Sequence, residues 1–513
     1  MPGMAKRVTD RQFAFGALVV AILVMLAMIF AMSTKGVWYD EVWAKWMART
    51  DLDLASTLVL RWSQDLHMPL FYLLNWLSAP IVGHGVIAHR FLSLLPLVGV
   101  VAAGACVAQL RPQMRHAMIV AGILFLTSHD AEYFAEYRPY ALIMCSTAIL
   151  LLLLSELLRR QSDLDWAKDR ALAVMLCIAI AVSFNLHYVT SLVSGVLLGM
   201  FILDRMRLKH WRWTMLLIVV GLVSTLPVLG TLWLQRGFFA AAVPDFWVDT
   251  DNLAAVRSII GRFVYSTGTN VAVLIALAIA AMLWIRGTHP VADPIERSFV
   301  NRLTTLVFLS VALSSVILLV ANSIRPVVIP RYLLGMTPII MLPVAIWAAT
   351  VLAGRRWLFA LFLANALAVG GWTYWTKAQR PSWDEGAQLV AATAKTCPQT
   401  IVYAVWRMKA RPLPTRFGPV PNEEEFVGWG VHDIGKIYGF ETRSIPATPT
   451  GRALLSPGGC PTIIYVEHTG GQLDGVLTAR AVGLLDGNSP EPAVKTVHTK
   501  TGDVIIISGQ GGR

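Results

Sequence analysis

The stretch FAFGALVVAILVMLAMIFAM, residues 13–32, is an unbroken apolar run long enough to cross a lipid bilayer as one helix. No small-residue cleavage site follows it, which favours a retained first span over a cleaved signal peptide. The next stretch, KGVWYDEVWAKWM at 35–47, sets two adjacent carboxylates, Asp40 and Glu41, among tryptophans. Such aromatic residues are typical of a membrane–water interface, so the two acids are expected to lie at the interface where the first span ends.

The composition of the whole chain supports a membrane protein. Hydrophobic residues make up 56% of the 513 residues and charged residues only 14%, which does not describe a soluble globular protein. The net charge is +12, from 43 Lys and Arg against 31 Asp and Glu. No basic stripe, zinc spacing or RNA-binding signature accompanies this charge, so it does not indicate a nucleic-acid partner.

Apolar segments recur along the chain and predict a polytopic α-helical protein. Eleven of them are expected to span, at roughly 13–32, 87–110, 117–128, 140–157, 171–185, 188–204, 214–234, 271–285, 303–321, 332–352 and 358–376. Most loop arginines and lysines lie between alternate spans, at 111–116, 159–170, 205–213, 286–297 and 354–357. The positive-inside rule makes these loops and the N-terminus cytoplasmic. The loops 33–86, 128–139, 186–187, 235–270 and 322–331, and everything after 377, are then expected outside.

The segment PLFYLLNWLSAPIV, residues 69–82, decides the number of crossings. It is apolar but only about 14 residues long, which is short for a span. If it crossed, every basic loop after it would move to the outer face, against the orientation rule. We therefore predict a juxtamembrane helix on the outer face.

The loops assigned to the outer face hold nearly all the candidate chemistry. Taken singly, acids at helix ends are often paired with a neighbouring arginine, and His187, between two short helices, could simply be capped by a neighbour. Glu132 and Glu136 are harder to dismiss. Spaced four residues apart, they would repel each other on one helical face unless a cation or a metal lay between them. The candidates are Asp40, Glu41, Asp65, His67, His129, Asp130, Glu132, Glu136, Arg138, Tyr140, His187, Arg325 and Arg331.

Four short motifs occur in order along these loops: WYDEVW (38–43), HMPLFY (67–72), AEYRPY (135–140) and RYLLGMTP (331–338). Together they resemble the polytopic, lipid-sugar-dependent glycosyltransferases of the C-type superfamily. The likeness is to bacterial members related to protein O-mannosyltransferases, lipid A aminoarabinose transferases and rhizobial galacturonosyltransferases, and it extends over roughly residues 10–376. The sequence departs from the family pattern at Met68, where a proline is usual, and at Ala135, where an arginine is usual.

The resemblance implies an enzyme of the bacterial cytoplasmic (inner) membrane that acts on its outer face. It would move a sugar from a polyprenyl-phosphate donor to a hydroxyl of a glycolipid, polysaccharide or protein acceptor, and so modify the cell envelope. Transporters and flippases for lipid-linked substrates are the alternative class. They usually show internal repeats and a site at the membrane midplane, which this sequence does not.

The candidate residues suit this chemistry in their own right. The acceptor hydroxyl must lose its proton as it attacks, and Asp40 is the candidate general base. Glu41 points about 100° away from Asp40 on a helix, so it is expected to orient the site or to pair with another group. The phosphate leaving group needs its charge neutralised, which arginine does well. The remaining assignments are Glu136 as a further catalytic carboxylate, Arg331, Arg138 and Arg325 for the donor phosphate, and His67, Tyr140 and His187 for substrate binding.

A divalent metal ion is a further option, with Asp40, Glu136 and His67 as the candidate ligands. No close spacing of ligand residues enforces such a site, so no cofactor is assigned from the sequence.

The composition changes at KAQRPSWDEGAQ, residues 377–388, to that of a soluble domain. We therefore divide the chain into a transmembrane domain, 1–376, and an extracytoplasmic α/β domain, 377–513. The patterns in the second part predict a helix at 384–396, strands at 400–406 and 462–468, a loop at 411–426 and a hairpin at 493–509.

Two of the five cysteines, Cys397 and Cys460, lie in this soluble part, and each is followed by a proline and then by a predicted strand. Their similar placement in an oxidising compartment predicts a disulfide between them. The other three, Cys106, Cys145 and Cys177, fall inside predicted spans.

Overall fold

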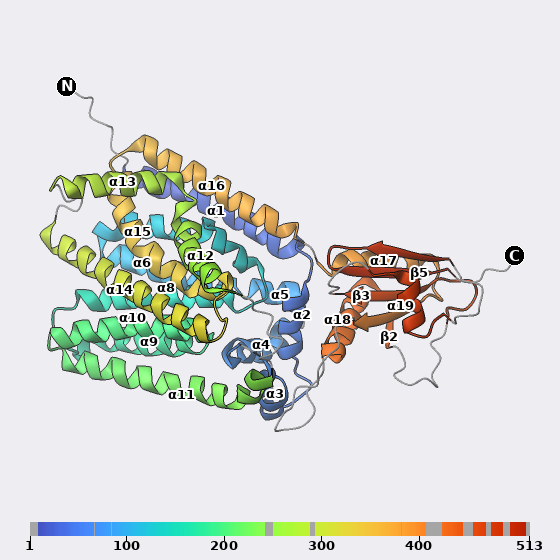
Figure 1. The fold of residues 1–513 in the computed structure, drawn as a ribbon. Helices are drawn as coiled ribbons and strands as arrows, with labels where there is room; N and C mark the ends of the chain where they lie inside the picture. Colours follow the sequence, from blue (N-terminus) through green and yellow to red (C-terminus); the bar gives the residue numbers. More distant parts are fainter. Residues whose placement is uncertain are drawn as a thin grey trace. The chain divides into compact units, whose positions relative to one another are not determined.

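The computed structural model describes residues 9–65, 67–83, 85–241, 250–287, 293–380, 382–406, 423–444, 455–467, 473–485 and 493–508. The chain forms two compact units (Figure 1). The first unit consists of Met1–Ser33 and Asp65–Ala378, and the second of Thr34–Gln64 and Gln379–Arg513. The segment after the first span thus belongs to the same unit as the C-terminal part of the chain.

The first unit is a bundle of helices joined mostly by short connections (Figure 1). Its α-helices are α1 (Asp10–Thr34), α4 (Pro69–Val82), α5 (Val86–Phe91), α6 (Leu94–Leu110), α7 (Arg115–Thr127), α8 (Tyr140–Arg159), α9 (Trp166–Phe184), α10 (Tyr188–Arg207), α11 (Trp211–Ala241), α12 (Asn252–Phe263), α13 (Val271–Ile285), α14 (Pro294–Ile324), α15 (Met336–Leu352) and α16 (Arg356–Ala378). Its short turns are η2 (Pro112–Met114), η3 (His129–Ala135), η4 (Val264–Gly268) and η5 (Pro330–Gly335).

The structure confirms a polytopic helical membrane protein with a C-terminal α/β domain, but with fewer clear spans than the sequence predicts. All eleven predicted segments are helical. Among the described residues, eight helices are long and apolar enough to cross, or nine if the pair of α12–η4 and α13, bent by 97°, is one span. The helices α7 and α13 have only 13 and 15 residues, and α9 carries Lys168, Asp169 and Arg170 near its start.

Burial separates the central spans from the peripheral ones. The most buried are α8 and α15, and α15 packs against α7, α8 and α14. The spans α1, α6 and α11 expose many large apolar side chains, as expected for helices that face lipid. The core of the first unit is therefore built around α7, α8 and α15.

The structure contains a helix at the position of the predicted juxtamembrane helix, namely α4 (Pro69–Val82), which has only 14 residues. A proline suits its first turn, where the backbone N–H has no helical partner. Gly83 follows it with φ 80°, a left-handed conformation that favours glycine and ends the helix.

The second unit contains a five-stranded sheet with strand order β2-β1-β3-β5-β4 (Figure 1). The strands β1 (Ile401–Trp406), β2 (Thr442–Ser444) and β3 (Thr462–Glu467) are parallel, and β5 (Gly502–Ile507) pairs antiparallel with β3 and with β4 (Val494–His498). The central β3 is buried along its whole length. The helices of this unit are α2 (Tyr39–Met47), α3 (Leu54–Leu60), the short η1 (Trp62–Gln64), α17 (Asp384–Thr396), α18 (Glu423–Tyr438) and α19 (Gly475–Ala481).

Most elements predicted for the soluble part are present. The helix at 384–396 is α17, the strands at 400–406 and 462–468 are β1 and β3, and the hairpin at 493–509 is formed by β4 and β5. The predicted loop at 411–426 lies mostly outside the described residues, which resume at Glu423. Its last four residues, 423–426, are helical and begin α18, so the prediction is wrong for them.

Cys397 and Cys460 form a disulfide in this unit, with their Cα atoms 5.7 Å apart. It joins the end of α17 to the residues before β3 and closes a loop of 63 residues. Replacing both cysteines by serine is expected to lower the free energy of unfolding of the domain by up to about 4 kcal/mol, because the unfolded chain gains freedom. Thermal unfolding of the variant and the parent in detergent measures this, and two free thiols in the oxidised parent by alkylation and mass spectrometry would contradict it.

Candidate functional site

A row of buried polar side chains lies in the first unit, between the start of α4 and the segment that joins η3 to α8. The Tyr72 hydroxyl donates to Asp65 Oδ2, and the same oxygen lies 3.1 Å from His67 Nδ1. His67 Nε2 lies 3.3 Å from Arg138 Nη2. An arginine only donates, so Nε2 accepts from Arg138 and the ring proton sits on Nδ1, facing Asp65. Asp65 and His67 therefore hold the guanidinium of Arg138 from one side.

The charged and polar groups around Asp65 favour its ionised form. Burial by itself raises the pKa of Asp65, but the His67 ring, the Tyr72 hydroxyl and the Arg138 guanidinium outweigh it and hold this pKa well below its ordinary value. The backbone of His67 is fixed as well, since its carbonyl accepts from Gln235 Nε2 at 3.2 Å. Gln235 in turn accepts from the Tyr188 hydroxyl at 2.6 Å, which ties the loop to α10 and α11.

His187 and Tyr332 extend this cluster of rings. The ring centroid of His187 lies 5.5 Å from that of His67 and 4.5 Å from that of Tyr332. His187 caps α10, because its Nδ1 accepts from the backbone N–H of Val189 at 3.2 Å. Burial, together with the His67 ring and Arg138, holds the pKa of His187 well below its ordinary value. His187 is therefore an uncharged ring whose Nε2–H can donate.

Two of the predicted phosphate ligands are close enough to act on this cluster. The guanidinium carbon of Arg138 lies 5.7 Å from the centre of the Tyr140 ring. The guanidinium carbon of Arg331 lies 6.0 Å from the centre of the Tyr332 ring. The positive charges of both arginines contribute to the lowered pKa of His187. Arg325 stands at the end of α14, six residues before Arg331 in the sequence.

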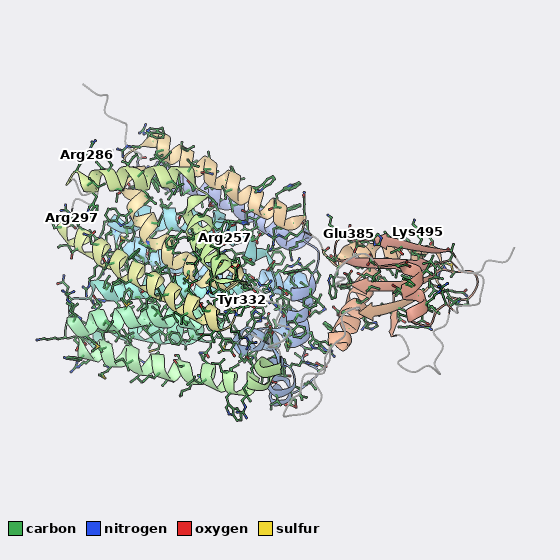
Figure 2. All side chains as sticks on the ribbon, in the orientation of Figure 1. Arg257, Arg286, Arg297, Tyr332, Glu385 and Lys495 are labelled. Carbon is green, nitrogen blue, oxygen red and sulfur yellow. A yellow bond between two sulfur atoms is a disulfide. The ribbon has the colours of Figure 1, made fainter. Side chains whose placement is uncertain are left out.

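An apolar cavity of about 500 Å³ adjoins this cluster, among α9, α10, α11 and the residues before η5. Its polar side is formed by His187, Tyr188 and Tyr332, the last of which is labelled in Figure 2. Most of its remaining wall is apolar and includes Phe184, Leu192, Val228 and Leu232. The arrangement suits a ligand with a polar or anionic end and a hydrocarbon part.

The segment between α7 and α8 contains the short helix η3, which ends just before Glu136. Lys377, at the end of α16 and fully buried, is paired with Glu136 and lies 3.8 Å from Glu132. A cation thus contacts both glutamates, but the predicted shared helical face is not present, because Glu132 lies in the 3-10 helix η3 and Glu136 follows it in an extended conformation. On the same loop, Asp130 binds Arg262 Nη1 of α12 at 2.6 Å and the Thr337 hydroxyl of α15 at 2.5 Å.

The sequence did not point to Lys377 or Arg262 as partners of these acids, because both come from spans far along the chain. Their positions near helix ends are the only signal that could have found them. Within the described ranges, no group of three or more His, Cys, Asp or Glu side chains is arranged to hold a metal ion.

Asp40 and Glu41 belong to the second unit, in the first turn of α2. Glu41 is fully buried, and its Oε2 lies 2.6 Å from Nζ of the buried Lys35. Asp40 is partly exposed. The adjacent acids therefore have different surroundings, with Glu41 committed to a buried ion pair.

Comparison with known proteins gives a likeness of fold. The chain matches no protein-family model and no curated protein. It resembles the crystal structure of ArnT from Cupriavidus metallidurans in the apo state, with a TM-score of 0.54 at 12% identity, over 96% of this chain and 98% of that one. It also resembles ArnT from the same organism bound to undecaprenyl phosphate, with a TM-score of 0.53 at 11% identity, over 97% and 98% of the two chains. The two proteins share a fold along nearly their whole length.

Proposed function

We propose that this chain is a membrane glycosyltransferase that moves a sugar from a polyprenyl-phosphate donor to an acceptor hydroxyl. The observation that carries the proposal is the buried cluster of Arg138, His67 and His187 next to an apolar cavity, which suits a lipid with a phosphate end. The fold supports it, since ArnT shares this fold and one of its structures holds undecaprenyl phosphate. The four sequence motifs support it independently.

The reaction would take place on the outer face of the bacterial inner membrane. This placement follows from the basic loops, which assign the N-terminus to the cytoplasm and the C-terminal domain to the outer side. Donor and acceptor would then both be presented at the membrane surface.

In the proposed step, Asp40 accepts the proton of the acceptor hydroxyl as its oxygen forms a bond to the anomeric carbon. The bond between that carbon and the phosphate oxygen breaks, and its electron pair leaves with the polyprenyl phosphate. Arg138 and Arg331, with Arg325 as a third candidate, neutralise the phosphate through charge-assisted hydrogen bonds. No general acid is needed, since a phosphate leaves as a weak base.

The other residues have supporting roles in this proposal. His67, His187 and Tyr140 bind the donor around the phosphate, and the apolar cavity takes part of the hydrocarbon chain. Glu41 holds the start of α2 through Lys35. Glu136, kept as a catalytic candidate on sequence grounds, is better suited to holding η3, because Lys377 neutralises it.

The test is transfer by the purified full-length protein in detergent or nanodiscs. Undecaprenyl phosphates that carry a hexose, a pentose or a uronic acid are supplied with envelope glycolipid acceptors, and free undecaprenyl phosphate and glycosylated product are measured by mass spectrometry. Envelope glycolipids and glycans from cells with and without the chain identify the natural acceptor. A folded protein that neither binds undecaprenyl phosphate nor releases it from any donor would contradict the proposal.

The contact between His67 and Arg138 provides a narrower prediction. His67→Ala removes the acceptor that orients the guanidinium, and a hydrogen bond to a charged group contributes roughly 1.5–3 kcal/mol. The dissociation constant for undecaprenyl phosphate is therefore expected to rise roughly tenfold to hundredfold, measured by native mass spectrometry or calorimetry. His129→Ala is the control, an exposed histidine on η3. Equal losses in both variants would argue against a specific role of His67.

A further inference from the structure

The second unit joins helix α2, which follows the first span, to the C-terminal α/β domain, residues 379–513. The first contact is made by the backbone before α2. Trp383 N–H donates to the Val37 carbonyl at 2.8 Å, and Val37 N–H donates to Asp384 Oδ2 at 3.2 Å. The Tyr39 ring packs edge-on against the Trp383 ring, with centroids 6.1 Å apart. The start of α2 is thus held by the residues that lead into α17.

The second contact joins the later turns of α2 to α18. Lys45 Nζ lies 2.5 Å from Asp433 Oδ2. The rings of Trp46 and Trp429 meet edge-on with centroids 5.1 Å apart. Arg49 lies over both rings, with its guanidinium carbon 4.7 Å from the centre of Trp46 and 5.2 Å from that of Trp429. An ion pair and two cation–π contacts therefore fix α2 along its length.

The third contact is a close approach that requires glycine. A Cβ atom on Gly430 of α18 would lie 2.7 Å from Val42 Cγ1 and 3.0 Å from the Trp383 ring. A Cβ atom on Gly36 would lie 2.1 Å from the Ser382 hydroxyl oxygen. These distances leave no room for a side chain, so the helix and the domain pack as parts of one core.

We infer that the C-terminal domain holds helix α2 in place, and that Asp433, Trp429 and Gly430 are positioning residues that fix the orientation of the Asp40 side chain. The inference rests on the proposed function, in which Asp40 is the base. It assigns the domain a role distinct from that of a movable lid over the acceptor. A lid that opened away from α2 would have to break the ion pair, the tryptophan contact and the glycine packing together.

The first experiment separates positioning from substrate binding. Asp433→Lys places a cation against Lys45, and Gly430→Val forces α2 and α18 apart. Either change is expected to lower kcat roughly tenfold to a hundredfold, since small misplacements of a catalytic group have effects of this size. The KM for the donor should stay within about twofold, because the phosphate ligands are untouched.

Two further variants make this result specific to the contact. The double variant Lys45→Asp with Asp433→Lys restores an ion pair of reversed polarity and is expected to recover most of the lost kcat. Glu441→Lys is the matched control, since this carboxylate is exposed just before β2. A charge swap that fails to recover kcat, or a control that loses as much as Asp433→Lys, would overturn the inference.

A second experiment does not depend on transfer activity. Trp46→Cys with Trp429→Cys, in a chain whose Cys106, Cys145 and Cys177 are replaced by alanine, puts two thiols where the two rings meet. A short bismaleimide then joins them, and the cross-link is measured by mass spectrometry of proteolytic fragments. The inference expects ready cross-linking and equal turnover of the variant before and after it. Failure to cross-link, or turnover that is lost on cross-linking, would show a domain that must leave α2. If the parent protein transfers no sugar, the proposed function fails alone, and the cross-link still reports the contact.

Discussion

Asp40→Asn is expected to bind the donor normally and to lower turnover by roughly 10² to 10⁴, the usual contribution of a general base. Asparagine keeps the shape of the side chain but cannot accept the hydroxyl proton. Asp40 is only partly buried, so Asp40→Asn is expected to keep the fold, and thermal unfolding of the variant checks this. Turnover is measured with purified variants at saturating donor, and donor binding is measured in parallel.

Glu41→Gln is the informative comparison for this variant. Glu41 is fully buried against Lys35, so the change leaves a buried cation without its partner. Loss of one partner of a buried pair typically destabilises a protein by about 3–5 kcal/mol, and this variant should therefore lose stability rather than turnover per folded molecule. Near-parental turnover in folded Asp40→Asn would remove Asp40 as the base.

Arg331→Ala is expected to lower kcat/KM by roughly 10² to 10³, because the phosphate loses a cation both in the bound donor and as its charge develops. Arg331→Lys should recover only part of the lost kcat/KM, since an ammonium cannot form the bidentate hydrogen bonds that a guanidinium makes to a phosphate. Binding of undecaprenyl phosphate should weaken in parallel, which distinguishes this variant from Asp40→Asn.

Arg257→Ala is the matched control, since this arginine is exposed on α12 (Figure 2). Arg325→Ala should have a smaller effect than Arg331→Ala, because Arg331 is the arginine next to Tyr332 and its charge acts on His187. A kcat/KM for Arg331→Ala as high as that of the control would remove Arg331 from the phosphate site.

Local signals were sufficient for the elements whose ends are set by their own residues. The helix α4 was predicted from an apolar run of about 14 residues, and α17 was predicted from its residue pattern. The sequence also predicted that His67, Arg138 and His187 lie on one side of the membrane. In the structure these three residues are close together. In these cases hydropathy, charge and turn residues carry the information.

The pairings between distant segments could not be predicted in this way. Lys45 and Asp433 are 388 residues apart, and Lys377 and Glu136 are 241 residues apart. No periodicity links such positions, because the contact is created by the packing of whole helices. For the same reason the sequence assigned residues 34–64 to the transmembrane domain, whereas their contacts place them in the second unit.

The fully buried Lys377 also constrains the order of biosynthesis. The ribosome completes Glu132 and Glu136 long before it reaches Lys377, at the end of the last span. Until α16 is inserted, Glu132 and Glu136 lack the cation that offsets the free-energy cost of burying their charges. The loop that carries part of the candidate site is therefore expected to close only once α16 is in place.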